Sequence, residues 1–232
     1  MTAAEPAFDC PLCPRLCDYR AHNSAEHPDW FNGPAPSFGD PSSRLLVVGL
    51  APGRHGANRT GRPFTGDFAG VLLYETLLKW GFARGRYGAK IDDGLTLDGC
   101  MITNAVRCAP PANRPTPLEE AQCRPFLSAR LAALPNLEVI VTLGDLARRN
   151  LLKALGLPAS TGGAGHGSEI DVRHYRLIHS YHCSRLNTNT GRLTPTMFSA
   201  IFERARCLLD HQTASACSAA PLASRASISS GP

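Results

Sequence analysis

The segment GLAPGRHGANRTGRPFTGD, residues 49–67, places glycines and arginines directly behind an apolar run. Glycines such as Gly49, Gly53 and Gly56 allow a ligand to approach the backbone closely. The segment lacks the Lys-Ser/Thr of a P-loop and the GxGxxG of a dinucleotide fold, so it does not indicate a nucleotide cofactor. It ends at Asp67, whose carboxylate could act on a substrate or could simply cap the following helix.

Two further polar residues occupy positions where apolar runs end. Asn104 lies near the end of one run, where a buried amide must either find partners or face a ligand. His182 follows another run and is either a hydrogen-bonded structural residue or a catalyst. Residue type alone leaves both alternatives open.

The cysteines form a second chemical group, because nine of them occur in a chain without a signal-peptide pattern or a membrane-length apolar run. We therefore expect a cytoplasmic protein without a membrane partner, in which cysteines are metal ligands or free thiols. Cys10 and Cys13 form a CxxC, and Cys108 and Cys123 are fifteen residues apart. Four thiolates from two segments suit tetrahedral zinc or an iron-sulfur cluster. Spacing alone does not exclude Cys17 or Cys100 as ligands, although the position of Cys100 directly before a strand favours a small apolar filler.

The elements that must position these residues follow an α/β pattern. Short β-rich runs occur at 44–50, 101–106, 138–143 and 174–180, and the intervals between them can each hold a helix. Two of the runs are almost wholly apolar, as in parallel strands covered on both faces. Ligands of such sheets bind beyond the carboxyl ends of the strands. The Gly-, Pro- and Asn-rich segments after all four runs are therefore expected to converge on one rim.

Helix signals fill these intervals. The stretch 67–81 begins at a possible Asp67 cap and offers Val71, Leu72, Leu78 and Trp80 for a buried stripe. Thr116 opens a capping box, and Pro125 should kink or restart that helix. Thr-Pro at 194–195 starts another helix. The sequence predicts one domain over 1–209, and a disordered tail over 210–232 because large apolar residues are scarce there.

The charge balance is compatible with a nucleic-acid partner. The formal net charge is +5, and only three of the 24 basic residues are lysines. Guanidinium groups suit bidentate phosphate contacts, although Arg-rich codon usage in a GC-rich genome would give the same composition. Charge by itself therefore permits DNA or RNA as a partner without requiring either.

Four stretches together resemble the uracil-DNA glycosylase superfamily, specifically its family 5, the B-type enzymes. They are PDWFNGPAPSFGD (28–40), GLAPGRHGANRTGRPFTGD (49–67), TNAVRCAPPANRPTPLEEAQCRPFL (103–127) and SYHCSRLNTNTGRLTPTMF (180–198). The similarity extends in order from about Cys10 to Cys207. It implies a three-layer α/β/α sandwich around a four-stranded parallel sheet, and excision of uracil and other deaminated or modified bases from DNA by a monomer. It also implies a 4Fe-4S cluster and selects as its ligands Cys10, Cys13, Cys108 and Cys123.

The resemblance also suggests residues for the first catalytic motif, which would contain Gly49, Leu50, Ala51 and Gly53. The related family 4 carries an acidic residue at the second position, where this chain has Leu50. That motif therefore supplies no polar side chain to handle water. Asp67 is the family's proposed substitute.

The same resemblance implies how a flipped base would be held. Phe64 would stack on the base, Asn104 would hydrogen-bond its polar edge, and His182 would face the carbonyl that gains charge. Arg185 belongs to a loop placed to wedge into the space that the base leaves. The family usually has Pro after the histidine, and Cys183 in its place leaves the loop backbone less constrained.

These residues suit glycosidic bond cleavage, in which positive charge develops on the sugar and negative charge on the base. A carboxylate at Asp67 and an imidazole donor at His182 would stabilise opposite ends of one transition state. The alternative is a non-catalytic, zinc-stabilised nucleic-acid-binding protein in which Asp67 is only a cap. An iron-sulfur electron carrier is a further alternative, but electron transfer does not explain a sheet rim crowded with polar loops.

Overall fold

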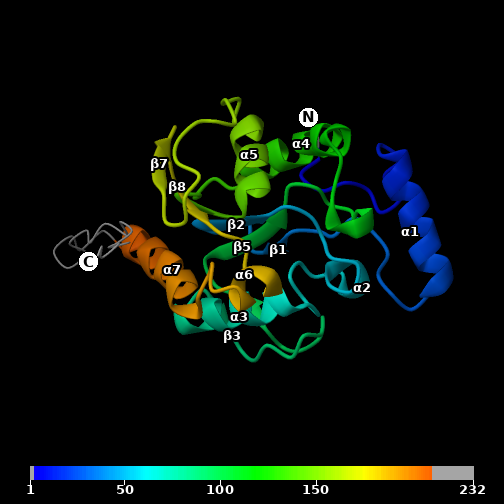
Figure 1. Cartoon of the computed structure of the whole chain (residues 1–232), viewed down its shortest axis with the longest axis horizontal. Coiled ribbons are helices and arrows are strands. Elements are labelled where there is room, and N and C mark those ends of the chain that lie inside the picture. The colour runs from blue at the N-terminus through cyan, green and yellow to red at the C-terminus, as the bar shows by residue number, and fades with distance from the viewer. Residues whose placement is uncertain (1–2, 211–232) are drawn as a thin grey trace, which may run out of the picture.

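A computed structural model describes residues 3–210, and the four predicted strands form the centre of its sheet (Figure 1). The strands β2 (Leu45–Gly49), β5 (Cys100–Asn104), β6 (Val139–Leu143) and β8 (Tyr175–Ser180) run parallel in the order β5-β2-β6-β8. Every residue of β2, β5 and β6 is buried, as expected of strands covered on both faces. The predicted strands are confirmed to within two residues at each end.

The sheet has six strands rather than the expected four. Short β1 (Phe38–Gly39) pairs antiparallel with β5, and β7 (Glu169–Val172) pairs antiparallel with β8. Neither edge strand has the continuous apolar run by which the central strands were recognised, because an edge strand is less enclosed than a central one.

The predicted three layers are confirmed (Figure 1). Helices α3 (Phe68–Lys79) and α7 (Pro195–Leu209) cover one face of the sheet, and α4 (Pro117–Ala132) and α5 (Asp145–Ala154) cover the other. Successive residues of β2 point to opposite faces of the sheet, so they pack in different cores. Leu45 and Val47 pack in the core with α3 and α7, while Leu46 and Val48 pack in the core with α4 and α5.

The helix starts follow the sequence, but one expectation about helix interiors is wrong and another holds only in part. Asp67 and Thr116 cap α3 and α4, the latter with the full capping box. Helix α4 nevertheless continues unbroken past Pro125. In α3 the buried face contains Leu73 and Leu77, whereas Val71 is 43% exposed. Leu72, Leu78 and Trp80 of the predicted stripe are partly buried and pack against the same core, so only Val71 was misassigned.

The remaining elements are short or peripheral. They are α1 (Pro14–Glu26), α2 (Ala57–Thr60), the 3₁₀ turn Pro111–Asn113, α6 (Arg185–Asn189), and the pair β3 (Ala83–Arg84) and β4 (Thr96–Leu97). Between residues 3 and 210, no helix is long and apolar enough to cross a membrane. Apart from Asp210, the predicted disordered tail lies outside the described residues.

Candidate active site

A pocket of about 510 Å³ lies beyond the carboxyl ends of the parallel strands. Three connections supply its lining: those after β2, β5 and β8. All the predicted catalytic and substrate-binding residues except Gly49 line it, namely Leu50, Ala51, Gly53, Phe64, Asp67, Asn104, His182 and Arg185. The structure therefore brings together residues that are up to 135 positions apart in the chain.

The fourth connection, after β6, contributes less than expected. Gly144 lies beside the pocket, since a Cβ built there would be 3.3 Å from the Cβ of His182. The following Asp145 already begins α5, and its carboxylate pairs with Arg148 at 2.9 Å and Arg149 at 2.7 Å. These side chains stabilise the helix start and do not line the pocket.

Gly49 does not line the pocket, but its missing side chain leaves space for two residues that do. A Cβ at Gly49 would lie 2.5 Å from Oδ1 of Asn104 and 2.7 Å from Cζ of Phe64. Only glycine therefore lets the amide and the ring meet the end of β2. Asn104 Oδ1 is buried and has no hydrogen-bond partner within residues 3–210. An unpaired buried acceptor is costly, so it indicates a place for a ligand.

The two oxygens of Asp67 have different surroundings. Oδ1 accepts a hydrogen bond from the Gly70 backbone N–H at 2.9 Å, which caps α3. Oδ2 faces the glycine loop: a Cβ at Gly56 would lie 2.5 Å from it, and a Cβ at Gly53 would lie 3.4 Å away. The capping interpretation is thus confirmed for one oxygen, and it leaves the other oxygen available to the pocket.

Asp67 and His182 have pKa values shifted in opposite directions. Burial raises the pKa of Asp67, and hydrogen bonding to Gly70 and the nearby imidazole partly offset this. Burial lowers the pKa of His182, and the charge of Asp67 opposes that shift. The shifts favour a neutral imidazole near pH 7, and its ring makes no hydrogen bond within the described part of the chain. The ring centroid of Phe64 lies 6.2 Å from that of His182.

The loop after β8 is held by its own side chains. The guanidinium of Arg185 lies 5.2 Å from the ring centroid of Phe68 at the pocket, and Leu186 is 72% exposed. Asn187 Nδ2 donates to the carbonyl of His182 at 2.8 Å, so it fixes the backbone of the histidine. Cys183 is buried outside the pocket, with its thiol 3.6 Å from the Ala69 carbonyl.

Sequence reasoning missed several pocket residues. Arg54 and His55 belong to the glycine loop but carry no distinctive spacing, and Asn113 comes from the Pro-rich segment after β5. Asn113 has a φ of 55°, a left-handed conformation that Asn tolerates. An Asn at a turn is common, so its identity alone did not indicate a site.

The predicted metal ligands gather elsewhere, where α1 meets the segment between β5 and α4. Cys10, Cys13, Cys108 and Cys123 line one small cavity together with Cys17, whereas Cys100 is buried in β5 within the main core. This agrees with the expectation that Cys100 is an apolar filler and not a ligand. Cys17 lines the same cavity, so its position does not exclude it as a ligand.

Two hydrogen-bond donors point at these sulfurs. The Arg107 backbone N–H donates to Cys123 Sγ at 3.3 Å, and the Arg20 guanidinium lies 3.6 Å from Cys108 Sγ. Burial raises the pKa of the Cys108 thiol to about 12 and that of Cys13 to about 11, and neighbouring cysteines add to both shifts. Between residues 3 and 210, no three His, Cys, Asp or Glu side chains are grouped as around a single metal ion. A bound metal centre would lower the pKa values of these thiols and favour their thiolate forms.

Comparison with known proteins gives a consistent result. The sequence model of the uracil DNA glycosylase superfamily matches residues 36–206. A type-5 uracil-DNA glycosylase of Thermus thermophilus is 44% identical over 208 residues, covering 86% of this chain and 93% of that protein. One from Pyrobaculum aerophilum is 41% identical, covering 85% and 88%. A type-4 uracil-DNA glycosylase of Thermotoga maritima is 40% identical over 110 residues, 47% of this chain.

The superfamily match includes all the segments that form the pocket, from the end of β2 to the loop after β8. The matches to the type-5 relatives extend over most of both chains, so they are not limited to a shared motif. This chain belongs to the uracil-DNA glycosylase superfamily.

Proposed function

We propose that this protein is a DNA-repair glycosylase that hydrolyses the N-glycosidic bond of uracil and other deaminated bases and leaves an abasic site. The observation that carries the proposal is a half-buried carboxylate, Asp67, and a half-buried imidazole, His182, that line one pocket with the buried, unpaired amide oxygen of Asn104. Family membership supports the reaction class.

A base inside duplex DNA cannot reach such a pocket, so it must be flipped out at a cost of a few kcal/mol, which is lowest for mismatched pairs. A flipped base would lie between the Phe64 ring and the pocket wall. The unpaired Oδ1 of Asn104 accepts an N–H from the polar edge of the base. Arg185 and the exposed Leu186 then fill the gap in the helix.

Bond cleavage separates charge between the two fragments. Asp67 Oδ2 faces the growing positive charge on the sugar and orients the attacking water, which supplies a hydroxyl to the sugar and a proton to the base. His182 donates an N–H to the base oxygen that gains negative charge. Because its pKa is lowered, it does so as a neutral imidazole, a donor that needs no protonation near pH 7.

The cysteine cavity fits a 4Fe-4S cluster held by Cys10, Cys13, Cys108 and Cys123. All four line one cavity, and N–H donors suited to thiolates lie at two of the sulfurs. When bound, the cluster would supply a covalent connection between the N-terminal segment and the start of α4. No observation on the described residues favours the zinc-stabilised, non-catalytic alternative. Membership of the glycosylase superfamily argues against it.

Several finer features of the function stay predictions. They are a monomeric state, a cytoplasmic location and a substrate range wider than uracil. The third rests on Leu50 and Gly56, which bring no polar side chain to the pocket that would reject an alternative base; Ala57, the other small residue on which the expectation rested, does not line the pocket.

The proposal is tested with oligonucleotides that each carry one lesion, uracil or hypoxanthine, in single- and double-stranded form. We expect strand breaks at the lesion after alkaline treatment, and release of the free base. Undamaged oligonucleotides are the control. Binding without base release would support the alternative of a non-catalytic DNA-binding protein.

A further inference from the structure

Phe64, the proposed stacking residue, has an unusual backbone. Its φ is 54°, a left-handed conformation that a bulky residue adopts only when its surroundings impose it. Its carbonyl packs against α3 at Gly70, where a Cβ would lie 1.7 Å from the oxygen. The same carbonyl accepts a hydrogen bond from the Tyr87 hydroxyl at 3.2 Å.

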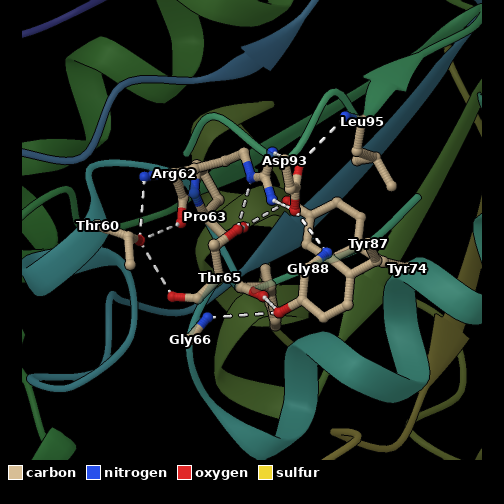
Figure 2. A network of polar contacts seen from close by, with 11 residues as sticks. Thr60, Arg62, Pro63, Thr65, Gly66, Tyr74, Tyr87, Gly88, Asp93 and Leu95 are labelled. Atoms are coloured by element: carbon tan, nitrogen blue, oxygen red, sulfur yellow. Dashed lines mark hydrogen bonds and ion pairs between the residues drawn. The ribbon is translucent and has the colours of Figure 1, made fainter. Parts of the chain in front are cut away.

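A buried ion pair fixes the residues on either side of this ring (Figure 2). The side chains of Arg62 and Asp93 are 1% and 5% exposed, and two parallel hydrogen bonds of 2.9 and 2.7 Å join them. Arg62 Nε also donates to Thr65 Oγ1 at 2.7 Å. Arg62 and Thr65 lie on either side of Phe64 in the sequence. The Arg62 guanidinium therefore links both ends of the turn that carries Phe64 to Asp93.

The pair itself is enclosed by polar and aromatic groups. Asp93 accepts two backbone N–H groups of the β3–β4 connection, Gly88 at 2.8 Å and Leu95 at 3.0 Å. The guanidinium carbon of Arg62 lies 5.3 Å from the ring centroid of Tyr74 and 5.9 Å from that of Tyr87. Both tyrosines reach back to the turn, since the Tyr74 hydroxyl donates to the Pro63 carbonyl at 2.6 Å.

We propose that Arg62, Asp93 and Tyr87 are positioning residues that fix the Phe64 ring for the flipped base. Neither member of the ion pair lines the pocket, so the pair acts through the turn and not by contact with substrate. It joins the catalytic loop to the β3–β4 connection, which contributes no pocket residue of its own. This inference rests on the proposed stacking role of Phe64.

The first test compares Asp93→Asn with Glu169→Gln, a control in which a carboxylate paired with Arg204 at 2.8 Å is altered at the sheet edge, away from the pocket. We expect Asp93→Asn to lower the single-turnover rate on uracil-containing DNA by about 10- to 100-fold per folded molecule, because small misplacements near a reacting group cost rates of this size. The Kd for undamaged duplex should stay unchanged, and Glu169→Gln should keep both values.

Tyr87→Phe is the second variant, in case Asp93→Asn fails to fold. It keeps the ring and removes only the hydroxyl that contacts the Phe64 carbonyl and, at 3.4 Å, the Gly66 N–H. We expect a smaller loss, about 3- to 10-fold, in the same rate. Wild-type rates per folded molecule in both variants would overturn the proposal.

A double-mutant cycle tests whether Asp93 affects the cleavage rate through Phe64. If Asp93 acts through Phe64, the loss in Phe64→Ala combined with Asp93→Asn should be no larger than in Phe64→Ala alone. Additive losses would overturn the positioning role. An inactive wild-type protein would instead refute the proposed glycosylase function, and a fully active Phe64→Ala would refute the stacking role on which the inference rests.

Discussion

Substitution of Asp67 by Asn separates the two functions that the structure gives this side chain. Oδ1 caps α3 by accepting from Gly70, and Oδ2 faces the glycine loop of the pocket. Asn retains an oxygen for the cap but loses the negative charge. Ala loses both the cap and the charge.

We expect Asp67→Asn to have a small effect on stability and a large effect on the cleavage rate. Asn and Asp are equally good N-caps, so Asp67→Asn should change the free energy of unfolding by less than about 0.5 kcal/mol, while Asp67→Ala should cost about 1 kcal/mol. Burial already raises the pKa of the carboxyl, which means that the charged form is not favoured by its surroundings. If that charge stabilises the sugar cation, both variants should lose about 100- to 1000-fold in cleavage rate, the scale of one well-placed electrostatic group.

The assay pairs urea unfolding with single-turnover cleavage of uracil- and hypoxanthine-containing duplexes at saturating protein. Because the carboxylate acts on the sugar, the loss should be similar for both bases. A rate that falls only in Asp67→Ala, and in proportion to lost stability, would show that the residue is a cap alone. Equal rates for wild type and Asp67→Asn would refute the reasoning outright.

Gly56→Ala should lower the cleavage rate by about 100-fold although it replaces no titratable group. The new Cβ would lie 2.5 Å from Asp67 Oδ2 and would force the carboxylate to move by about 1 Å. An unaffected rate would show that this oxygen need not stay in place. Activity should fall as pH drops through an apparent pKa above the ordinary 3.8 of an aspartate, since burial raises the pKa of Asp67 and protonation removes the required charge; the pH profile of Asp67→Asn should lack this step. His182→Ala should lose about 100- to 1000-fold, and more on the base that is the poorer leaving group, as measured by the ratio of rates on hypoxanthine and uracil. Cys10→Ser should lose iron, labile sulfide and thermal stability together, whereas Cys17→Ser should keep them; stoichiometric zinc without iron in anaerobically purified wild-type protein would contradict the cluster assignment.

The central strands and helix starts were predictable because the signals that define them are local. A run such as 44–50 is apolar along its whole length, and Thr116 with Glu119 forms a capping box that is visible in the sequence and present in the structure. The edge strands β1 and β7 were missed because they are short and carry no apolar run. In α3 only Val71 was misassigned, because Val71 and Leu73 are equally apolar and the sequence gives no contrast between them.

The sequence indicated which residues belong to the candidate site, but not the contacts that hold them in place. Motif resemblance indicated Asp67, Asn104 and His182, and strand order implied that they would meet at one rim. Nothing local in the sequence links Arg62 to Asp93, because the contact spans 31 positions and depends on how the β3–β4 connection folds back. Likewise, no spacing rule indicates that one oxygen of Asp67 serves as the helix cap while the other stays available.

Cys183 stands where the family resemblance leads us to expect a proline, and the structure shows which contacts hold the loop in this chain. Proline would restrict the loop through its own φ. In this chain the Cys183 thiol lies 3.6 Å from the carbonyl of Ala69, in the first turn of the helix that Asp67 caps. Asn187 also donates to the His182 carbonyl at 2.8 Å. The Cys183 contact therefore ties the histidine loop to the helix that Asp67 caps, and the Asn187 contact holds the backbone of His182 within that loop, so the position of the imidazole relative to Asp67 depends on side-chain contacts at both residues.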